Sequence, residues 1–452
     1  MANQKPRYAG YFIFTGLAFY LFFHQTSSFG FCGFFVAKAG AKLFNKSSQV
    51  VLVRDENKSV LTMGNDYQGD VKEFALVVPV PTVLKEKQIR VGEQALIDRI
   101  DGYTAPRLAE YYDGDPCRPI AEFKVARSQM PPGAMRKRAK NKLGVKIEAK
   151  YAIGEYDILI LSAEKSSGLL EWLNQNGYAL PKEASQILRS YIKQGLKFFV
   201  AKVNLDRLEK SGRVKLRPLQ IAYESPRFML PIRLGTINGQ GFQDLFVYAI
   251  TKKGRIELVN YKTKKLPSNM DIPVFIKNDF QNFYKDMFAE TWNKENKKSA
   301  ILEYAWDMNW CDPCAENPLS PKELRGLGVF WIEKAQAHER GRRRRPQGAQ
   351  PAYVTRLHLR YNGHTFPEDL IFKPTQNKEN FQGRFVIRHK WKGEMTCEGA
   401  ESYKKSLASR QEQEAKNLAS ITGWDINDIR KKMEIKKVDK KASDDWLDHI
   451  WK

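Results

Sequence analysis

The stretch SQVVLVRDENKSVLTMGNDYQGDVKEFALVVPVPTV, residues 48–83, determines the class of fold that the sequence predicts. It contains three apolar runs, Val50–Val53, Val60–Met63 and Phe74–Val80, separated by segments rich in Asn, Asp and Gly. Short apolar runs bounded by turn residues are typical of strands. We therefore expect a β-meander. The two prolines of VVPVP should lie at an edge or where the strand leaves the sheet, because proline donates no ladder hydrogen bond.

Strand and helix patterns both follow this stretch, so the predicted class is α+β, with β-rich mixed sheets and packed helices. Strands are expected at Tyr156–Ala163 and Tyr353–Asn362, and in KFFVAKVN, LQIAYES, LFVYAIT and NFQGRFVIRHKW. Helical spacing marks Ala95–Ile100, a short helix beginning at Ala105–Arg107, and the sequences LLEWLNQ and PKEASQILRSYIKQG. From Glu401 onward the pattern predicts a charged helical extension that ends in a second short helix.

The chain of 452 residues, 42% of them hydrophobic, is long enough to bury sizeable cores, and its length suggests two or three domains. A Pro-Pro-Gly break followed by the basic sequence RKRAKNK marks the clearest linker. The expected divisions are 1–30 as a signal peptide or anchor, 31–123 as an N-terminal β-rich block, 124–150 as a basic linker, 151–400 as an α+β main block and 401–452 as the helical extension.

The first thirty residues have the pattern of a secretory signal peptide. Lys5 and Arg7 precede an uncharged run, residues 8–23, that is too short for a comfortable membrane span. Ser28 and Gly30 are small residues at suitable positions, so we expect cleavage after Gly30. If the segment is retained, residues 8–23 would anchor the protein in a membrane. Either outcome places the remainder in the periplasm, in the cell envelope or outside the cell.

The chain has a surplus of positive charge, with 75 Lys and Arg against 51 Asp and Glu, a net charge of +24. Such a surplus favours polyanionic partners, for example an acidic envelope polymer or anionic lipid. The alternative is an organism whose proteins are generally basic. Export argues against nucleic acid as the partner, because nucleic acid is usually met in the cytoplasm.

The Cys-x-x-Cys pair in YAWDMNWCDPCAENPLS, Cys311 and Cys314, has three interpretations. A thiol-disulfide catalyst needs its first thiol at a helix N-terminus, but Asp312 adds negative charge between the sulfurs and two prolines follow the pair. A zinc site needs four ligands, and the other cysteines and the histidines are scattered. We favour a structural disulfide, with catalysis by Cys311 and Cys314 as the alternative.

Five cysteines cannot all pair within one chain, and the sequence does not give their connectivity. The simplest set joins Cys117 to Cys397 and Cys311 to Cys314, which suits an oxidising environment outside the cytoplasm. A bridge that closes a long loop contributes about 2–4 kcal/mol to stability.

The stretch HERGRRRRPQGAQPAYVTRLHLRYNGH contains candidate contacts for a polyanion. They are Arg342, Arg343, Arg344, Arg345, Arg356 and Arg360. Alternation along the expected strand places Arg356, His358 and Arg360 on one face, which would bind phosphate or carboxylate groups if it were exposed. For the strand we favour the other interpretation, in which Arg356 and Arg360 pair with acids of the protein such as Glu368 and Asp369, and we keep the arginine run as a candidate polyanion contact.

Signals for catalysis or cofactor binding are weak elsewhere. The serines of YESPRF and SSGLLEW lack a nucleophile elbow, and the glycines of RLGTINGQG do not have the spacing of a phosphate-binding loop. Six histidines offer few general bases. We therefore predict no cofactor and no metal, and favour a non-enzymatic binding or structural component.

Seven motifs occur in order between Phe31 and His389: FCGFF, EFALVVPVP, TAPRL, YDILILSA, YAWDMNWCDPC, VTRLHLRYNGHTFPEDLIF and FQGRFVIRH. Together they resemble the bacterial exported family called domain of unknown function 2330. Members often begin with Cys-Gly-Gly-Phe-Phe-Cys, whereas this chain has CGFFV and lacks one cysteine of that pattern. The resemblance implies an envelope or secreted location and an unassigned activity, and it transfers no catalytic residue.

Overall fold

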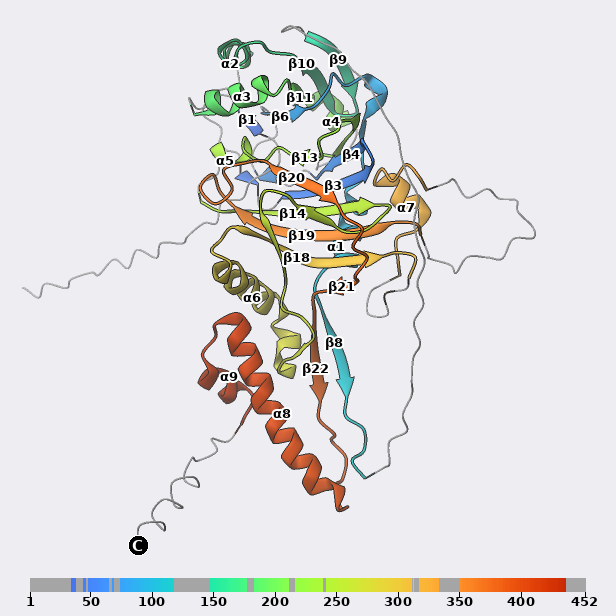
Figure 1. Cartoon of the computed structure of the whole chain (residues 1–452), viewed down its shortest axis with the longest axis vertical. Coiled ribbons are helices and arrows are strands. Elements are labelled where there is room, and N and C mark those ends of the chain that lie inside the picture. The colour runs from blue at the N-terminus through green and yellow to red at the C-terminus, as the bar shows by residue number, and fades with distance from the viewer. Residues whose placement is uncertain are drawn as a thin grey trace, which may run out of the picture.

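A computed structural model shows an elongated molecule with a large mixed sheet near its middle (Figure 1). The structure describes residues 34–37, 44–45, 48–64, 67–68, 74–117, 147–176, 183–210, 216–238, 241–310, 312, 317–332 and 350–435. The expected signal segment and most of the expected basic linker therefore lie outside the described residues.

The large sheet contains the first two apolar runs as an antiparallel hairpin, β3 and β4. Its strands, in order across the sheet, are β16 (Lys262–Lys265), β18 (Ser299–Asp307), β19 (Tyr353–Tyr361), β14 (Gln243–Thr251), β3 (Ser48–Asp55), β4 (Lys58–Met63), β12 (Leu219–Glu224) and β7 (Ile89–Val91), with β21 (Phe381–Gln382) paired to β18. The adjacent interior strands β18, β19 and β14 are buried almost throughout. Side chains on both of their faces therefore need partners inside the protein.

The third apolar run forms β6, which lies in a second sheet, so the expected three-stranded meander is wrong. β12 occupies the place beside β4 instead. The second sheet has the order β1 (Phe34–Ala37), β6 (Phe74–Val80), β11 (Lys197–Val203), β10 (Tyr156–Leu161) and β9 (Ile147–Ile153). Pro79 has no N–H to donate, but it lies beyond the residues of β6 that pair with β1. In the described strands, no partner on the β1 side therefore needs a hydrogen bond from it.

Helices α2 (Ser166–Gln175) and α3 (Ala184–Lys193) pack on the second sheet. Leu188 and Tyr191 of α3 belong to the same buried cluster as Phe198 of β11, at the helical spacing that the sequence shows. On its other side the sheet shares a core with the large sheet, which includes Leu52 and Ile158. The second sheet is therefore a layer between helices and the large sheet.

A parallel ribbon of β8 (Arg107–Tyr112) and β22 (Arg384–His389), with β17 (Met270–Asp271) beside β22, extends away from the large sheet (Figure 1). The helix expected to begin at Ala105–Arg107 is therefore wrong. α1 (Gln94–Thr104) ends just before it, and β8 pairs with β22 along its whole length. Pairing with a distant strand is a tertiary interaction that overrides local spacing.

Helices pack beside this ribbon and form the other end of the molecule. They are η3 (Val274–Asn278), α6 (Phe280–Lys294), α8 (Gly399–Thr422) and α9 (Ile426–Lys432). Leu418 and Ile421 of α8 are buried in one cluster with Phe283 and Met287 of α6. Gly423 adopts φ 73° and ends α8, so that the chain turns back into α9. The predicted helical extension is confirmed.

The remaining elements are short. They are β2 (Phe44–Asn45), β5 (Tyr67–Gln68), β13 (Met229–Leu230), β15 (Ile256–Leu258), β20 (Leu370–Pro374), η2 (Glu86–Gln88), α4 (Leu205–Lys210), α5 (Gly235–Asn238) and α7 (Pro321–Gly326). The whole is the β-rich α+β class that the sequence predicts. Among the described residues, no helix has the length and apolar character needed to cross a membrane.

Candidate functional site

A disulfide joins Cys117 and Cys397, which are 280 residues apart in the sequence. It connects the turn after β8 to the residues just before α8, with the two Cα atoms 5.8 Å apart. This bond is one of the two pairings that the sequence favoured. Because disulfides persist in oxidising environments, the bond indicates that the protein resides in an oxidising compartment.

Cys311 and Cys314 lie outside the described residues, so their pairing and any catalytic role stay predictions. Asp312 between them is described and is buried. Its Oδ2 accepts hydrogen bonds from the Tyr304 hydroxyl at 3.1 Å and from the Gln382 amide at 3.0 Å. The carboxylate between the two cysteines is thus anchored to β18 and β21.

The arginine run Arg342–Arg345 also lies outside the described residues. Arg356 and Arg360 are on β19, where the basic face of the strand is covered, so the less favoured interpretation, an exposed cationic face, is wrong. Arg356 is 4% exposed, because β19 is a central strand and contacts from α1 and α6 cover this face. The predicted alternation along the strand is right, since Leu357 and Leu359 on the opposite face lie in the main core.

The covered face of β19 holds a buried ion network. Arg356 Nε lies 2.6 Å from Glu303 Oε2, and its Nη1 lies 2.6 Å from Asp101 Oδ1. His358 joins two acids, with Nδ1 3.1 Å from Glu303 Oε1 and Nε2 3.3 Å from Asp244 Oδ1. The strand arginines therefore pair inside the protein, as the favoured interpretation held, but with acids other than Glu368 and Asp369.

The network is balanced when its histidine is protonated. The members are three cations and three carboxylates: Arg356, His358, Arg360, Glu303, Asp101 and Asp244. Burial alone would lower the pKa of His358, but the neighbouring carboxylates of Glu303 and Asp244 outweigh burial and raise it. The ring also stacks between Phe246 and Phe288, with centroids 4.1 and 3.6 Å away. Since its members partner one another, we expect the network to have a structural role.

This network predicts that the protein loses stability as pH rises above neutrality. A histidine whose pKa is raised by folding contributes stability that is complete below its unfolded pKa, about 6.5, and is lost as pH rises through the folded pKa. We expect the free energy of unfolding in urea to fall as pH rises above about 6.5. His358→Gln should make this fall smaller and the exposed His364→Gln should leave it unchanged. An equal fall in both variants would refute the assignment.

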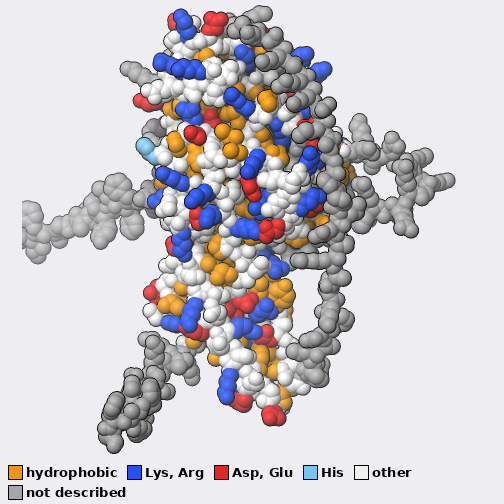
Figure 2. All heavy atoms as spheres, in the orientation of Figure 1, with side chains coloured by type: hydrophobic (Ala, Val, Ile, Leu, Met, Phe, Trp, Pro, Cys, Tyr) orange, Lys and Arg blue, Asp and Glu red, His pale blue; other side chains and the backbone are white. Residues whose placement is uncertain are grey.

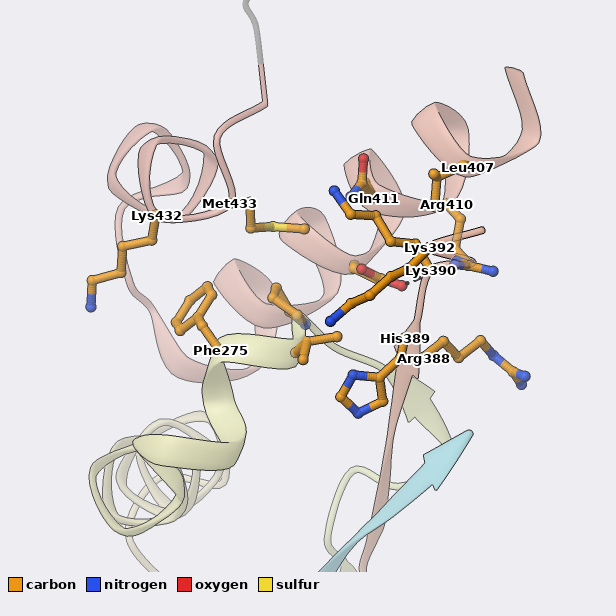
Figure 3. A pocket seen from close by; sticks show the side chains of 13 residues that line it. Phe275, Arg388, His389, Lys390, Lys392, Leu407, Arg410, Gln411, Lys432 and Met433 are labelled. Atoms are coloured by element: carbon orange, nitrogen blue, oxygen red, sulfur yellow. Dashed lines mark ion pairs between the residues drawn. The ribbon is translucent and has the colours of Figure 1, made fainter. Parts of the chain in front are cut away.

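A separate pocket of about 280 Å³ lies where β22, η3, α8 and α9 meet (Figure 3). Part of its lining is apolar, including Val274, Phe275, Leu407 and Met433. Most of the rest is basic. The basic residues are Arg388, His389, Lys390, Lys392, Arg410 and Lys432. Glu414 is the one acidic residue that lines it.

Acidic partners hold two of the pocket's guanidinium groups in place. Arg388 Nε lies 3.1 Å from Asp271 Oδ1. Arg410 donates two hydrogen bonds to Asp113, at 2.9 and 2.7 Å, and the Tyr403 hydroxyl donates a third at 2.6 Å. Burial opposes ionisation of Asp113, but these hydrogen bonds lower its pKa, so the carboxylate stays charged. The two arginines are therefore oriented before any ligand arrives.

Lys390 and Lys392 are exposed and have no hydrogen-bond or ion-pair partner within the described part of the chain. They lie between β22 and Cys397, so the disulfide fixes the far end of the segment that carries them. Elsewhere, basic and acidic side chains are interspersed over the visible face of the molecule (Figure 2). The pocket thus combines gathered cations with a concave shape, which suits an anion.

Sequence reasoning did not select this pocket. The cations of RHKWK, residues 388–392, were a usable signal. Arg410 and Glu414 look like ordinary charged residues of an exposed helix, and η3 comes from much earlier in the chain. Only the tertiary arrangement brings these parts together. In the described part of the chain, no cluster of His, Cys, Asp and Glu could hold a metal ion.

The fold and the site define a mixed α+β protein that is tied by a disulfide and carries a basic pocket at its helical end. A family model described as "Uncharacterized protein conserved in bacteria (DUF2330)" matches residues 26–373, and the chain belongs to this family. The matched residues include η3 but end before β22, α8 and α9. No curated protein and no solved structure matches the chain.

Proposed function

We propose that this protein is a non-enzymatic component of the cell envelope, or a secreted protein, that binds an acidic polymer through the basic pocket. The observation that carries the proposal is the lining of the pocket. Of thirteen lining residues, five are Lys or Arg and one is acidic. Planar guanidinium groups held in place and flexible lysines beside them suit phosphate, sulfate or carboxylate groups.

A linear polymer fits the arrangement better than a single small anion or an anionic lipid. Lys390 and Lys392 lie two positions apart just after the end of β22 and line the same pocket, so two acidic groups of one polymer can contact them. On the neighbouring strand β8, Tyr111 and Tyr112 are 42% and 71% exposed. Their rings offer apolar faces beside the cations.

The proposed location rests on the disulfide and on the N-terminal sequence. The Cys117–Cys397 bond supports an oxidising compartment. Residues 1–30 would direct export, and residues 8–23 would retain the protein at a membrane if they are not removed. Insulin-reduction activity that disappears in Cys311→Ser would contradict the non-enzymatic part of the proposal and favour a thiol-disulfide enzyme using Cys311 and Cys314.

The double variant Lys390→Gln/Lys392→Gln should bind heparin, a model acidic polymer, more weakly than the wild type. Each exposed ion pair contributes about 0.2–1 kcal/mol, so loss of two should weaken binding by roughly 2- to 30-fold. The difference should shrink as salt is raised, because salt screens exposed charges. Retention on a heparin column in a salt gradient, followed by titration calorimetry, measures both effects.

The matched control is Lys193→Gln/Lys202→Gln, which removes the same charge from exposed residues of α3 and β11 at the other end of the molecule (Figure 1). It should bind heparin like the wild type. Equal weakening in both double variants would show that net charge alone is responsible and would refute the pocket. If the protein floats with phosphatidylglycerol vesicles but does not bind heparin, its ligand is anionic lipid and not an acidic polymer.

A further inference from the structure

We infer that Glu414 makes the pocket a proton-dependent oxyanion site, which binds a sulfate, phosphate or carboxylate group when the Glu414 side chain is protonated and releases it when that side chain is ionised. This inference rests on the proposed function, and it names the chemical group that enters the pocket and the signal that controls binding.

The position of Glu414 is unusual for an acidic residue. It is 3% exposed although it lies on a charged helix, and it lines the pocket. Its Oε1 is buried and has no hydrogen-bond partner among the described residues. The nearest cation is Arg410, whose Nε lies 3.4 Å away and also lacks a hydrogen bond. Buried polar atoms without partners are costly, so a ligand that satisfies them gains free energy.

Arg410 is a weak counter-ion for Glu414 because its two terminal nitrogens already bind Asp113. Burial raises the pKa of Glu414 to about 7, Arg410 opposes this, and the carboxylates of Asp271 and Asp113 add to it. About half of the molecules therefore carry a protonated Glu414 at neutral pH. The charged or titratable groups around it are Arg410 from α8, Arg388, His389, Lys390 and Lys392 from β22 and the segment after it, Asp271 from β17, Asp113 after β8 and Lys432 from α9.

These groups can attract the anion by their positive charge and can bind it by hydrogen bonds. Lys390 and Lys392 supply positive charge that has no acidic partner in the described part of the chain. The protonated carboxyl of Glu414 donates its O–H to an oxygen of the bound anion, whereas the ionised carboxylate has no donor and repels the anion. At about 280 Å³ the pocket is near the lower limit for ligand sites, so it suits one such group of a polymer.

Sulfate is the appropriate probe because it stays a dianion throughout the range tested. Protonation of Glu414 falls from about nine-tenths at pH 6 to about one-tenth at pH 8, so sulfate should bind the wild type about tenfold more weakly at pH 8. In Glu414→Gln the amide donates at every pH, so affinity should be independent of pH and should exceed that of the wild type at pH 8. His389→Gln controls for the pocket histidine and should keep the dependence. Titration calorimetry measures all three proteins.

A Glu414→Gln variant that keeps the tenfold dependence would overturn this inference and leave the polymer proposal standing, provided that Lys390→Gln/Lys392→Gln still weakens heparin binding. Should Glu414→Gln fail to fold, sulfate titration of the wild type in two buffers of different ionisation enthalpy replaces it. Binding near pH 7.5 should take up more than about half a proton per sulfate, and no uptake would overturn the inference. If Lys390→Gln/Lys392→Gln loses sulfate binding but keeps heparin binding, the anionic group that enters the pocket does not belong to the polymer.

Discussion

Replacing Glu303 by alanine is expected to lower the free energy of unfolding by about 3–5 kcal/mol, measured in urea at neutral pH. Glu303 is fully buried on β18 and accepts contacts from Arg356 and His358 of β19 and from the Tyr284 hydroxyl of α6. Its removal leaves two buried cations with one carboxylate fewer. The cost arises because the remaining charges stay inside the protein without water.

Two further variants separate this effect from a general loss of charge. Glu303→Gln keeps the size of the side chain and should cost less than Glu303→Ala, while still destabilising the protein. Glu379→Ala removes a carboxylate whose side chain is 56% exposed and pairs with Lys265, and it should change stability by less than about 1 kcal/mol. If Glu303→Ala were as stable as Glu379→Ala, the ion network would have no structural role.

Removing the disulfide is expected to cost a comparable amount. The double variant Cys117→Ser/Cys397→Ser should lose about 2–5 kcal/mol of unfolding free energy, because the bond closes a loop of 280 residues and restricts the unfolded chain. It should also weaken heparin binding, because the segment that carries Lys390 and Lys392 loses its fixed end. Urea unfolding with and without a reductant measures the first effect.

The reductant serves as the internal control for this prediction. It should destabilise the wild type by about as much as the double substitution does, and it should have little effect on the double variant. A double variant as stable as the wild type would contradict the account. So would a reductant effect that persists undiminished in the variant, because it would place the stabilising bond among the other cysteines.

The central strands could be predicted because their sequences are dense in β-branched and aromatic residues. The strand expected at Tyr353–Asn362 is β19, and the one expected at Tyr156–Ala163 is β10. Alternation along β19 also gave the correct faces, with Leu357 in the core and His358 opposite. The sequence that becomes β18 is not among the predicted strands, and its pairing with β19 makes it one.

Arrangements that depend on distant parts of the chain could not be predicted. Arg107–Tyr112 has apolar residues at positions that fit a helix, and β22 makes it a strand. The acidic partners of Arg356 could not be predicted for the same reason, because Asp101 and Glu303 belong to elements that only the fold brings beside it. Strand alternation shows which residues share a face, but it does not show whether that face meets water or another helix.

The pocket illustrates the same limit at the candidate site. Its cations are visible in the sequence, but the buried carboxyl of Glu414 is not, since nothing in α8 distinguishes it from the acids around it. Its burial follows from the packing of α8 beside η3 and β22. A burial-dependent pKa near 7 is therefore a property that only the folded chain has.

Hydrogen exchange of the full chain with and without heparin tests the central claim most directly, because it shows where the polymer binds. The account predicts slower exchange in peptides that cover residues 384–392 and 407–414, and unchanged exchange in α2 and α3. Lys390→Gln/Lys392→Gln should reduce that protection and Lys193→Gln/Lys202→Gln should keep it. Protection confined to other parts of the molecule, or none at a saturating heparin concentration, would contradict the account.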